Sequence, residues 1–157
     1  MTLESLQVWL LLVLGALLVW VGIEDARTRE IANWKNAAIA LLAPVWWWAL
    51  GVTPWPGIAE QLLLAAVVFA VFCACFHMGW MGGGDVKLLA ALALWLPAGV
   101  FLTMLIVMSL AGGVLTLAML IEQRWRRCEG PLEIPYGVAI AFAALMSLRE
   151  PILNQFA

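Results

Sequence analysis

At residues 79–87 the chain reads GWMGGGDVK, a glycine run that ends in an aspartate and opens an apolar run. Clustered glycines interrupt regular structure, so this stretch is expected to separate two helices. The lack of side chains at residues 82–84 would let a peptide backbone approach the Asp85 carboxylate closely. A flexible turn, or close helix packing through Gly79 and Gly83, explains the same residues without any reaction.

The composition is that of a membrane protein. Of the 157 residues, 66% are hydrophobic and 11% are charged, and the mean hydropathy is +1.02. A soluble domain is nearer half apolar and a quarter charged. Because a spanning helix needs about 20 mostly apolar residues, the chain is predicted to be all-α, with about six transmembrane helices in one multi-pass domain over residues 1–157. The lipid bilayer is its expected partner, and the lack of a basic tract argues against nucleic acid.

Glycine and proline breakers divide the chain into six apolar runs. The fourth and sixth runs are short, so they are expected to tilt, to thin the bilayer locally or to start in a water-filled cavity. Pro135 suits the first turn of a helix. The runs are Leu6–Ile23, Asn36–Leu50, Ile58–Phe76, Val86–Leu96, Ala98–Ile121 and Tyr136–Leu148.

The basic residues predict the orientation, because they tend to stay on the cytoplasmic side. All except Arg149 lie in or beside the connections that follow the first, third and fifth runs, which puts both termini outside the cytoplasm. Tryptophans favour membrane interfaces: Trp46–Trp48, Trp55 and Trp95 are expected at the outer one, and Trp34, Trp80 and Trp125 at the inner one. The basic residues at the three connections are Arg27, Arg29, Lys35, Lys87, Arg124, Arg126 and Arg127.

Two aspartates, Asp25 and Asp85, are expected to meet at the cytoplasmic face. They are 60 positions apart, but an even number of crossings lies between them. Two close carboxyls share one proton: the ionised one takes a proton from water, and the neutral one hydrogen-bonds to the scissile carbonyl. The pair therefore predicts an aspartyl peptidase. Taken singly, Asp25 is equally typical of an interface charge beside Arg27 and Arg29, and Asp85 of a helix cap.

The GWMGGGDVK stretch resembles the signature of type IV prepilin peptidases, membrane aspartyl proteases that include preflagellin peptidases and, more distantly, presenilin. IAN at residues 31–33 is similar to the family's Ile-Pro-Asn, with Ala32 in place of proline, which is expected to loosen that turn slightly. IPYG at residues 134–137 is similar to the family's Pro-Tyr-Gly segment. The resemblance implies that Asp25 and Asp85 are the catalytic pair. The residues expected to support them or to bind substrate are Gly82, Gly83, Gly84, Lys87, Asn33, Pro135, Tyr136 and Gly137.

The resemblance also implies a substrate: a pilin or pseudopilin precursor with a short basic leader and an apolar helix. Cleavage is expected at the cytoplasmic face of the bacterial inner membrane, with neither a cofactor nor a metal. Larger family members carry a methyltransferase domain and a four-cysteine zinc motif between the first two helices. Only a short polar connection is present here, so N-methylation is not expected, and the short form resembles the peptidases of tight-adherence (Flp-type) pili.

Several charged residues have more than one interpretation. Lys87 either favours the ionised form of Asp85 or extends toward lipid headgroups. Glu30 and Glu133 either pair with arginines or attract a basic leader, and Glu24 is expected to face away from Asp25 as an interface charge.

The alternative function is a transporter or an assembly subunit that binds cations through the two aspartates. Transporters usually place ionisable groups near the bilayer midplane and often show inverted repeats, and no repeat is evident here. A lipid-modifying enzyme that binds Mg²⁺ would need a denser cluster of acids.

Overall fold

The structure, a computed structural model, describes residues 2–126 and 134–148. These ranges form six helices and contain no strand, which confirms the all-α prediction. The residues Arg127, Glu133 and Arg149, which entered the sequence argument, lie outside the described ranges. The elements are α1 (Leu3–Thr28), α2 (Asn33–Leu50), a single irregular helical turn η1 (Pro54–Ile58), α3 (Ala59–His77), α4 (Gly83–Ala93), α5 (Ala98–Arg126) and α6 (Tyr136–Ser147).

The helices begin and end at different residues from the apolar runs. Helix α1 continues past Ile23, so Asp25 lies inside its last turns rather than at its end. The helix stops at Arg29, which adopts a left-handed conformation (φ 58°) and donates its backbone N–H to the Asp25 carbonyl at 3.0 Å. Helix α4 begins three residues before the expected start because Gly82, in an extended conformation, caps it. Asp85 is therefore the third residue of α4.

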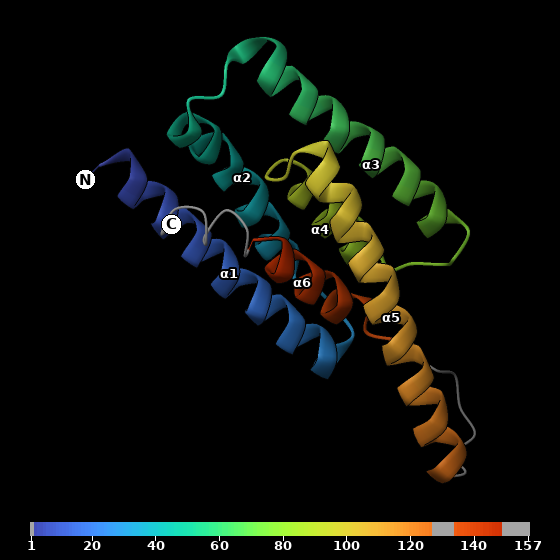
Figure 1. The fold of residues 1–157 in the computed structure, drawn as a ribbon. Helices are drawn as coiled ribbons and strands as arrows, with labels where there is room; N and C mark the ends of the chain where they lie inside the picture. Colours follow the sequence, from blue (N-terminus) through green and yellow to red (C-terminus); the bar gives the residue numbers. More distant parts are fainter. Residues whose placement is uncertain (1, 127–133, 149–157) are drawn as a thin grey trace.

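Helix α4 lies at the centre of the bundle and contacts α2, α3, α5 and α6. Helix α6 packs between α1 and α5, and α3 lies at the opposite edge against α4 (Figure 1). The C-terminal part of α5 projects beyond the other helices (Figure 1). The core is formed by fully buried aliphatic side chains of α1, α2, α4 and α6, among them Leu14, Leu18, Ile39, Leu88, Leu92 and Ile140.

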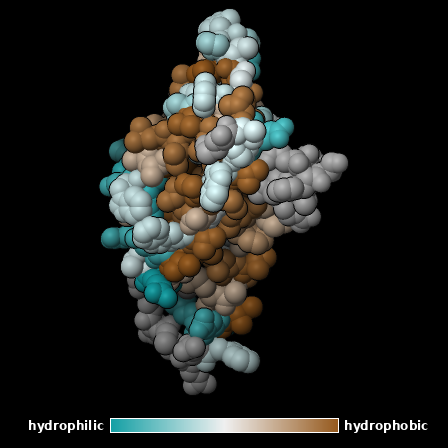
Figure 2. Space-filling model, turned by 90° about the vertical axis from the view of Figure 1, so that its left-hand side faces the viewer, coloured by the Kyte–Doolittle hydropathy of each residue, from teal (hydrophilic) through white to brown (hydrophobic). Residues whose placement is uncertain are grey.

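The outer surface is apolar where a soluble protein would be polar. Large side chains such as Leu41, Leu110 and Val114 are at least two-thirds exposed. Figure 2 shows broad apolar surface across the middle of one face, with hydrophilic residues mainly toward its edge and ends. An apolar surface of this extent is typical of a protein that contacts a membrane or another protein.

Within the described residues, three segments are long and apolar enough to cross a membrane: Leu3–Thr28, Pro54–His77 and Ala98–Trp125. Helix α4 has only 11 residues, about 17 Å at 1.5 Å per residue, whereas the hydrocarbon core is about 30 Å thick. Helix α6 has 12 residues. Helix α4 is mostly buried among the other helices, whereas α6 exposes Phe142 and Met146. The expectation that these two short helices tilt, thin the bilayer or start in a water-filled cavity stays a prediction. The side on which the termini lie stays a prediction.

Three of the tryptophans expected at the outer interface are instead buried in the protein. The rings of Trp46 and Trp95 stack with their centroids 5.6 Å apart. The indole N–H of Trp47 donates to the carbonyl of Leu94 at 2.7 Å, and that of Trp95 donates to the carbonyl of Ile39 at 2.9 Å. The Leu94 carbonyl lies at the end of α4, where carbonyls lack partners within the helix, whereas Ile39 lies inside α2. All three rings pack inside the protein, so for these three residues the interface expectation was wrong.

Candidate active site

A cavity of about 530 Å³ opens where α1 ends and α4 begins, and it brings Asp25 and Asp85 together. These are the only two aspartates in the sequence. The two residues are 60 positions apart and belong to different helices, yet they line the same cavity. This agrees with the expectation that they come to one end of the molecule. The other lining residues come from the ends of α1, α4 and α6 and the connections beside them: Thr28, Arg29, Glu30, Gly79, Trp80, Met81, Gly82, Ile134 and Tyr136.

Helix α6 positions the Asp25 carboxylate. Only 4% of Asp25 is exposed, and its Oδ2 accepts the backbone N–H of Val138 at 3.1 Å. The backbone of Gly137 forms a second hydrogen bond to the same carboxyl. The first N–H groups of a helix have no partner within the helix and attract negative charge. The first turn of α6 therefore binds the Asp25 carboxylate.

Asp85 is held within its own helix. The Gly82 backbone hydrogen-bonds to its carboxyl, as happens when the third residue of a helix reaches back to the cap. Asp85 is 8% exposed and lies on α4, outside the three spanning segments. Burial raises the pKa of Asp85 to about 7, and the negative charge of Asp25 is the second cause of this increase. At neutral pH the cavity thus contains a carboxyl that still retains its proton for much of the time, close to a second carboxyl.

Ile31, in the connection between α1 and α2, lies between the start of α4 and the start of α6. A Cβ atom on Gly84 would come within 3.0 Å of the Ile31 Cβ. A Cβ atom on Gly137 would come within 2.9 Å of the Ile31 Cδ1 and within 2.8 Å of the Asp25 Cγ. The two contacts at Gly137 are closer than real Cβ atoms tolerate, and the contact at Gly84 is tighter than most real Cβ contacts. Glycine at both positions therefore lets the starts of α4 and α6 pack against Ile31. The packing expected through Gly79 and Gly83 is different: a Cβ atom on Gly79, which has a positive φ of 75°, would meet nothing within 4 Å, as suits a turn.

The other two glycines of the run differ in their surroundings. A Cβ atom on Gly82 would lie 3.1 Å from the Oδ2 of Asp85, whereas a Cβ atom on Gly83 would lie 3.4 Å from the Phe76 ring. Gly82 lines the cavity, so the backbone next to Asp85 is open to it at this residue. Close approach of a substrate backbone is thus still a prediction for Gly82, while Gly83 faces Phe76 of α3 and Gly84 faces Ile31.

Asn33 and Lys87 are brought together, but not in the aspartate cavity. The Lys87 Nζ donates to the Asn33 Oδ1 at 2.7 Å. Both residues line a separate cavity of about 390 Å³ between α2, α3 and α4. Lys87 follows Asp85 by two positions, and residues two apart on a helix face in different directions. Lys87 thus faces away from Asp85 and binds Asn33. Neither of the two interpretations from sequence, an effect on Asp85 or an extension toward lipid headgroups, predicted this contact.

The Pro-Tyr-Gly segment lies beside the acids. Pro135 is buried and immediately precedes α6, Tyr136 lines the cavity, and Gly137 contacts Asp25 as described above. The sequence interpretation placed these residues near the site without showing which acid they approach. The structure assigns Gly137 to Asp25, and it places Tyr136 on the wall of the cavity that both acids line.

Three residues beside the site have contacts that the sequence did not predict. Lys35, expected to be a cytoplasmic loop cation, is 1% exposed, and its Nζ lies 2.6 Å from the Oε2 of Glu24. Glu24 was expected to be a simple interface charge. Asn36 is buried, and its Nδ2 donates to the Gly84 carbonyl at 3.0 Å. The polar pair Lys35–Asn36 at the start of an apolar run was the available signal, but only the fold identifies their partners.

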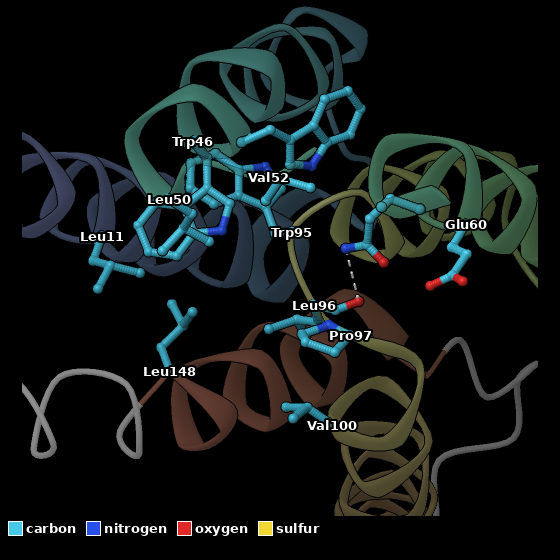
Figure 3. A pocket seen from close by; sticks show the side chains of 13 residues that line it. Leu11, Trp46, Leu50, Val52, Glu60, Trp95, Leu96, Pro97, Val100 and Leu148 are labelled. Atoms are coloured by element: carbon cyan, nitrogen blue, oxygen red, sulfur yellow. Dashed lines mark hydrogen bonds between the residues drawn. The ribbon is translucent and has the colours of Figure 1, made fainter. Parts of the chain in front are cut away.

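A third cavity, of about 510 Å³, lies at the opposite end of the bundle, and Figure 3 shows the side chains that line it. Its walls are mostly apolar and include Trp46, Trp95 and Leu148. Glu60 is its one acidic lining residue, and the neighbouring Gln61 amide donates to backbone carbonyls of the connection after α4. Neither aspartate lines this cavity, so the paired acids are confined to the end of the molecule described above.

Comparison with known proteins gives one match. The model of the type IV leader peptidase family matches residues 12–117, a range that contains both aspartates and the glycine run. No curated protein and no solved structure matches the chain.

Proposed function

This chain belongs to the type IV leader peptidase family, and from that premise we propose that it is an aspartyl endopeptidase of the membrane. It removes the basic leader from a prepilin-like precursor at the cytoplasmic face of a bacterial inner membrane. The observation that supports this proposal is that Asp25 and Asp85 line one cavity. We propose that these two carboxyls carry out the chemistry.

In the proposed reaction the two carboxyls share one proton. The ionised carboxyl removes a proton from a water molecule as the water oxygen attacks the scissile carbonyl. The protonated carboxyl donates to the carbonyl oxygen, so that the charge on the tetrahedral intermediate is stabilised. Collapse of the intermediate breaks the peptide C–N bond, and the leaving amine takes up a proton from the pair. The products are the leader carboxylate and a new amine on the mature chain, with no net change in the enzyme.

The cavity rim carries groups suited to a peptide at the membrane surface. Glu30 lines the cavity and supplies a negative charge for a basic leader. The apolar exterior beside the site suits the apolar helix of the precursor. The connection between α1 and α2 consists of residues 29–32, so we propose leader cleavage without N-methylation, with substrates of the tight-adherence (Flp) type.

The test uses the full-length protein in proteoliposomes with a prepilin precursor. Asp25→Asn and Asp85→Asn are each expected to lower kcat by at least about 10³-fold while the protein still inserts. Glu4→Gln, which changes an exposed acid at the other end of α1, is the matched control and should cleave like the parent. Processing by either Asn variant would reject the proposal, as would activity that a chelator abolishes and Mg²⁺ restores.

A further inference from the structure

Lys35 is an unusual residue for the edge of a membrane protein because it is enclosed. Its side chain is 1% exposed, and its ammonium lies 2.6 Å from the Glu24 carboxylate. The same ammonium is 4.4 Å from the centroid of the Trp20 ring, and Trp20 packs edge-to-face against Trp34 at 5.2 Å. A buried charge needs a well-placed partner, so this pair has little freedom to adopt other geometries.

Glu24 also contacts the connection between α1 and α2. Its Oε2 accepts the backbone N–H of Ala32 at 3.4 Å, a long hydrogen bond. One carboxylate thus joins three parts of the chain: the end of α1, the connection, and the first turn of α2 through Lys35. Ala32 was expected to loosen this turn because it replaces a proline. However, Ala32 has a backbone N–H that proline lacks, and its hydrogen bond to Glu24 helps to hold the turn.

The connection held by Glu24 carries Ile31, which adjoins Ala32. Ile31 is the side chain that approaches both Gly84 and Gly137. Gly84 adjoins Asp85, and Gly137 lies against Asp25. A movement of the connection would therefore shift the contacts of Ile31 with the starts of α4 and α6, and with them the positions of both acids.

We propose that Glu24 and Lys35 are positioning residues: they fix the connection that carries Ile31 and so set the relative placement of the Asp25 and Asp85 carboxyls. As a statement about catalysis, this rests on the proposed function. As a statement about geometry, it does not. Neither residue lines the aspartate cavity, so both act through Ile31 and not on substrate.

The backbone of Ala32 supplies a direct test. Its φ of −62° and ψ of 128° suit proline, whose ring holds φ near −65°. Ala32→Pro removes the hydrogen bond to Glu24 but fixes the same conformation covalently. If the pair acts by holding this turn, proline at position 32 should make the pair less necessary.

The kinetic experiment compares Glu24→Gln and Lys35→Met with the parent. A displacement of the reacting groups by about 1 Å costs up to about 100-fold, so kcat should fall between about 10- and 100-fold with KM unchanged, and the pH profile should shift. Adding Ala32→Pro to Glu24→Gln should restore most of the loss. Arg27→Met, which removes an exposed cation of α1, is the matched control and should change neither constant. Parental kcat in both variants, or no rescue by proline, overturns the proposal.

A second readout does not need catalysis. Labelling of Asp85 by a hydrophobic carbodiimide reports the protonation of its carboxyl, which depends on the neighbouring charge of Asp25. If Lys35→Met changes the relative placement of the two acids, labelling should disappear at a different pH from that in the parent, while Arg27→Met leaves the profile unchanged. A labelling profile that ignores Lys35 overturns the positioning role. A profile that depends on Lys35 in a protein that cleaves no prepilin overturns the proposed function and leaves the positioning role standing.

Discussion

The backbone N–H of Val138 donates to the Asp25 carboxylate at 3.1 Å, across 113 positions of the sequence. This contact makes the first turn of α6 part of the surroundings of an acid on α1. Gly137, next to Val138, lies so close to Asp25 that a Cβ atom there would meet the carboxyl carbon at 2.8 Å. The start of α6 is therefore expected to tolerate little change.

Gly137→Ala is predicted to impair both stability and cleavage. The added methyl group must displace Asp25 or Ile31, and overpacking of this kind costs about 1–3 kcal/mol. The measurement is thermal unfolding in detergent micelles together with prepilin cleavage. Gly113→Ala is the matched control, because a Cβ atom at that helical glycine meets nothing within 4 Å and alanine favours a helix by up to about 1 kcal/mol. If Gly137→Ala proves as stable and as active as Gly113→Ala, the close packing around Asp25 is refuted.

Asn36→Ala is predicted to loosen the start of α4. The substitution removes the hydrogen bond from the Asn36 amide to the Gly84 carbonyl, worth about 1 kcal/mol in a typical protein. Asn33→Ala, three residues earlier, removes only the exposed bond to Lys87 and should change stability by less than about 0.5 kcal/mol. Tryptophan fluorescence during thermal unfolding can compare the two variants, and equal stability of both would contradict the role assigned to Asn36.

The pH dependence of cleavage follows from Asp85. Because its pKa is raised from 3.8 to about 7, Asp85 keeps its proton below that pH and loses it above. A pair that needs one shared proton should therefore lose activity as the pH rises through about 7, and Glu4→Gln should not alter that profile. A constant rate up to about pH 9 would be incompatible with this mechanism.

The electrostatic interaction between Asp25 and Asp85 can be measured without substrate. The charge of Asp25 is the second cause of the raised pKa of Asp85, so Asp25→Asn should lower that pKa. Labelling of Asp85 by a hydrophobic carbodiimide, which reacts with the protonated carboxyl, should then disappear at a lower pH than in the parent. An unchanged labelling profile would show that the two carboxyls do not interact.

Glu30→Gln is predicted to weaken binding of a basic leader. Glu30 lines the cavity and is exposed, and an exposed ion pair contributes about 0.2–1 kcal/mol, so KM should rise by no more than about fivefold with kcat nearly unchanged. A precursor whose leader lysines and arginines are replaced by glutamine supplies the control, since the substitution should have no effect on it. A fall in kcat with constant KM would assign Glu30 a different role.

Part of the site could be predicted from sequence because it follows from one-dimensional patterns. The number of helices followed from apolar runs and breakers, and the convergence of Asp25 and Asp85 followed from the number of helices between them. The same reasoning misplaced Trp46, Trp47 and Trp95, because tryptophan at a run end is typical of a lipid interface and equally suits a buried indole with a carbonyl partner.

The sequence by itself determined that this chain lies in a membrane, that its described part is helical, and that its two aspartates sit near helix ends. Hydrophobic runs and glycines act locally, so they can be read along the chain. Only the tertiary structure decided that Ile31 packs against Gly84 and Gly137, that Lys35 is enclosed against Glu24, and that Lys87 binds Asn33. Those contacts join residues from different helices, and their formation depends on how side chains of matching shape and charge pack in three dimensions.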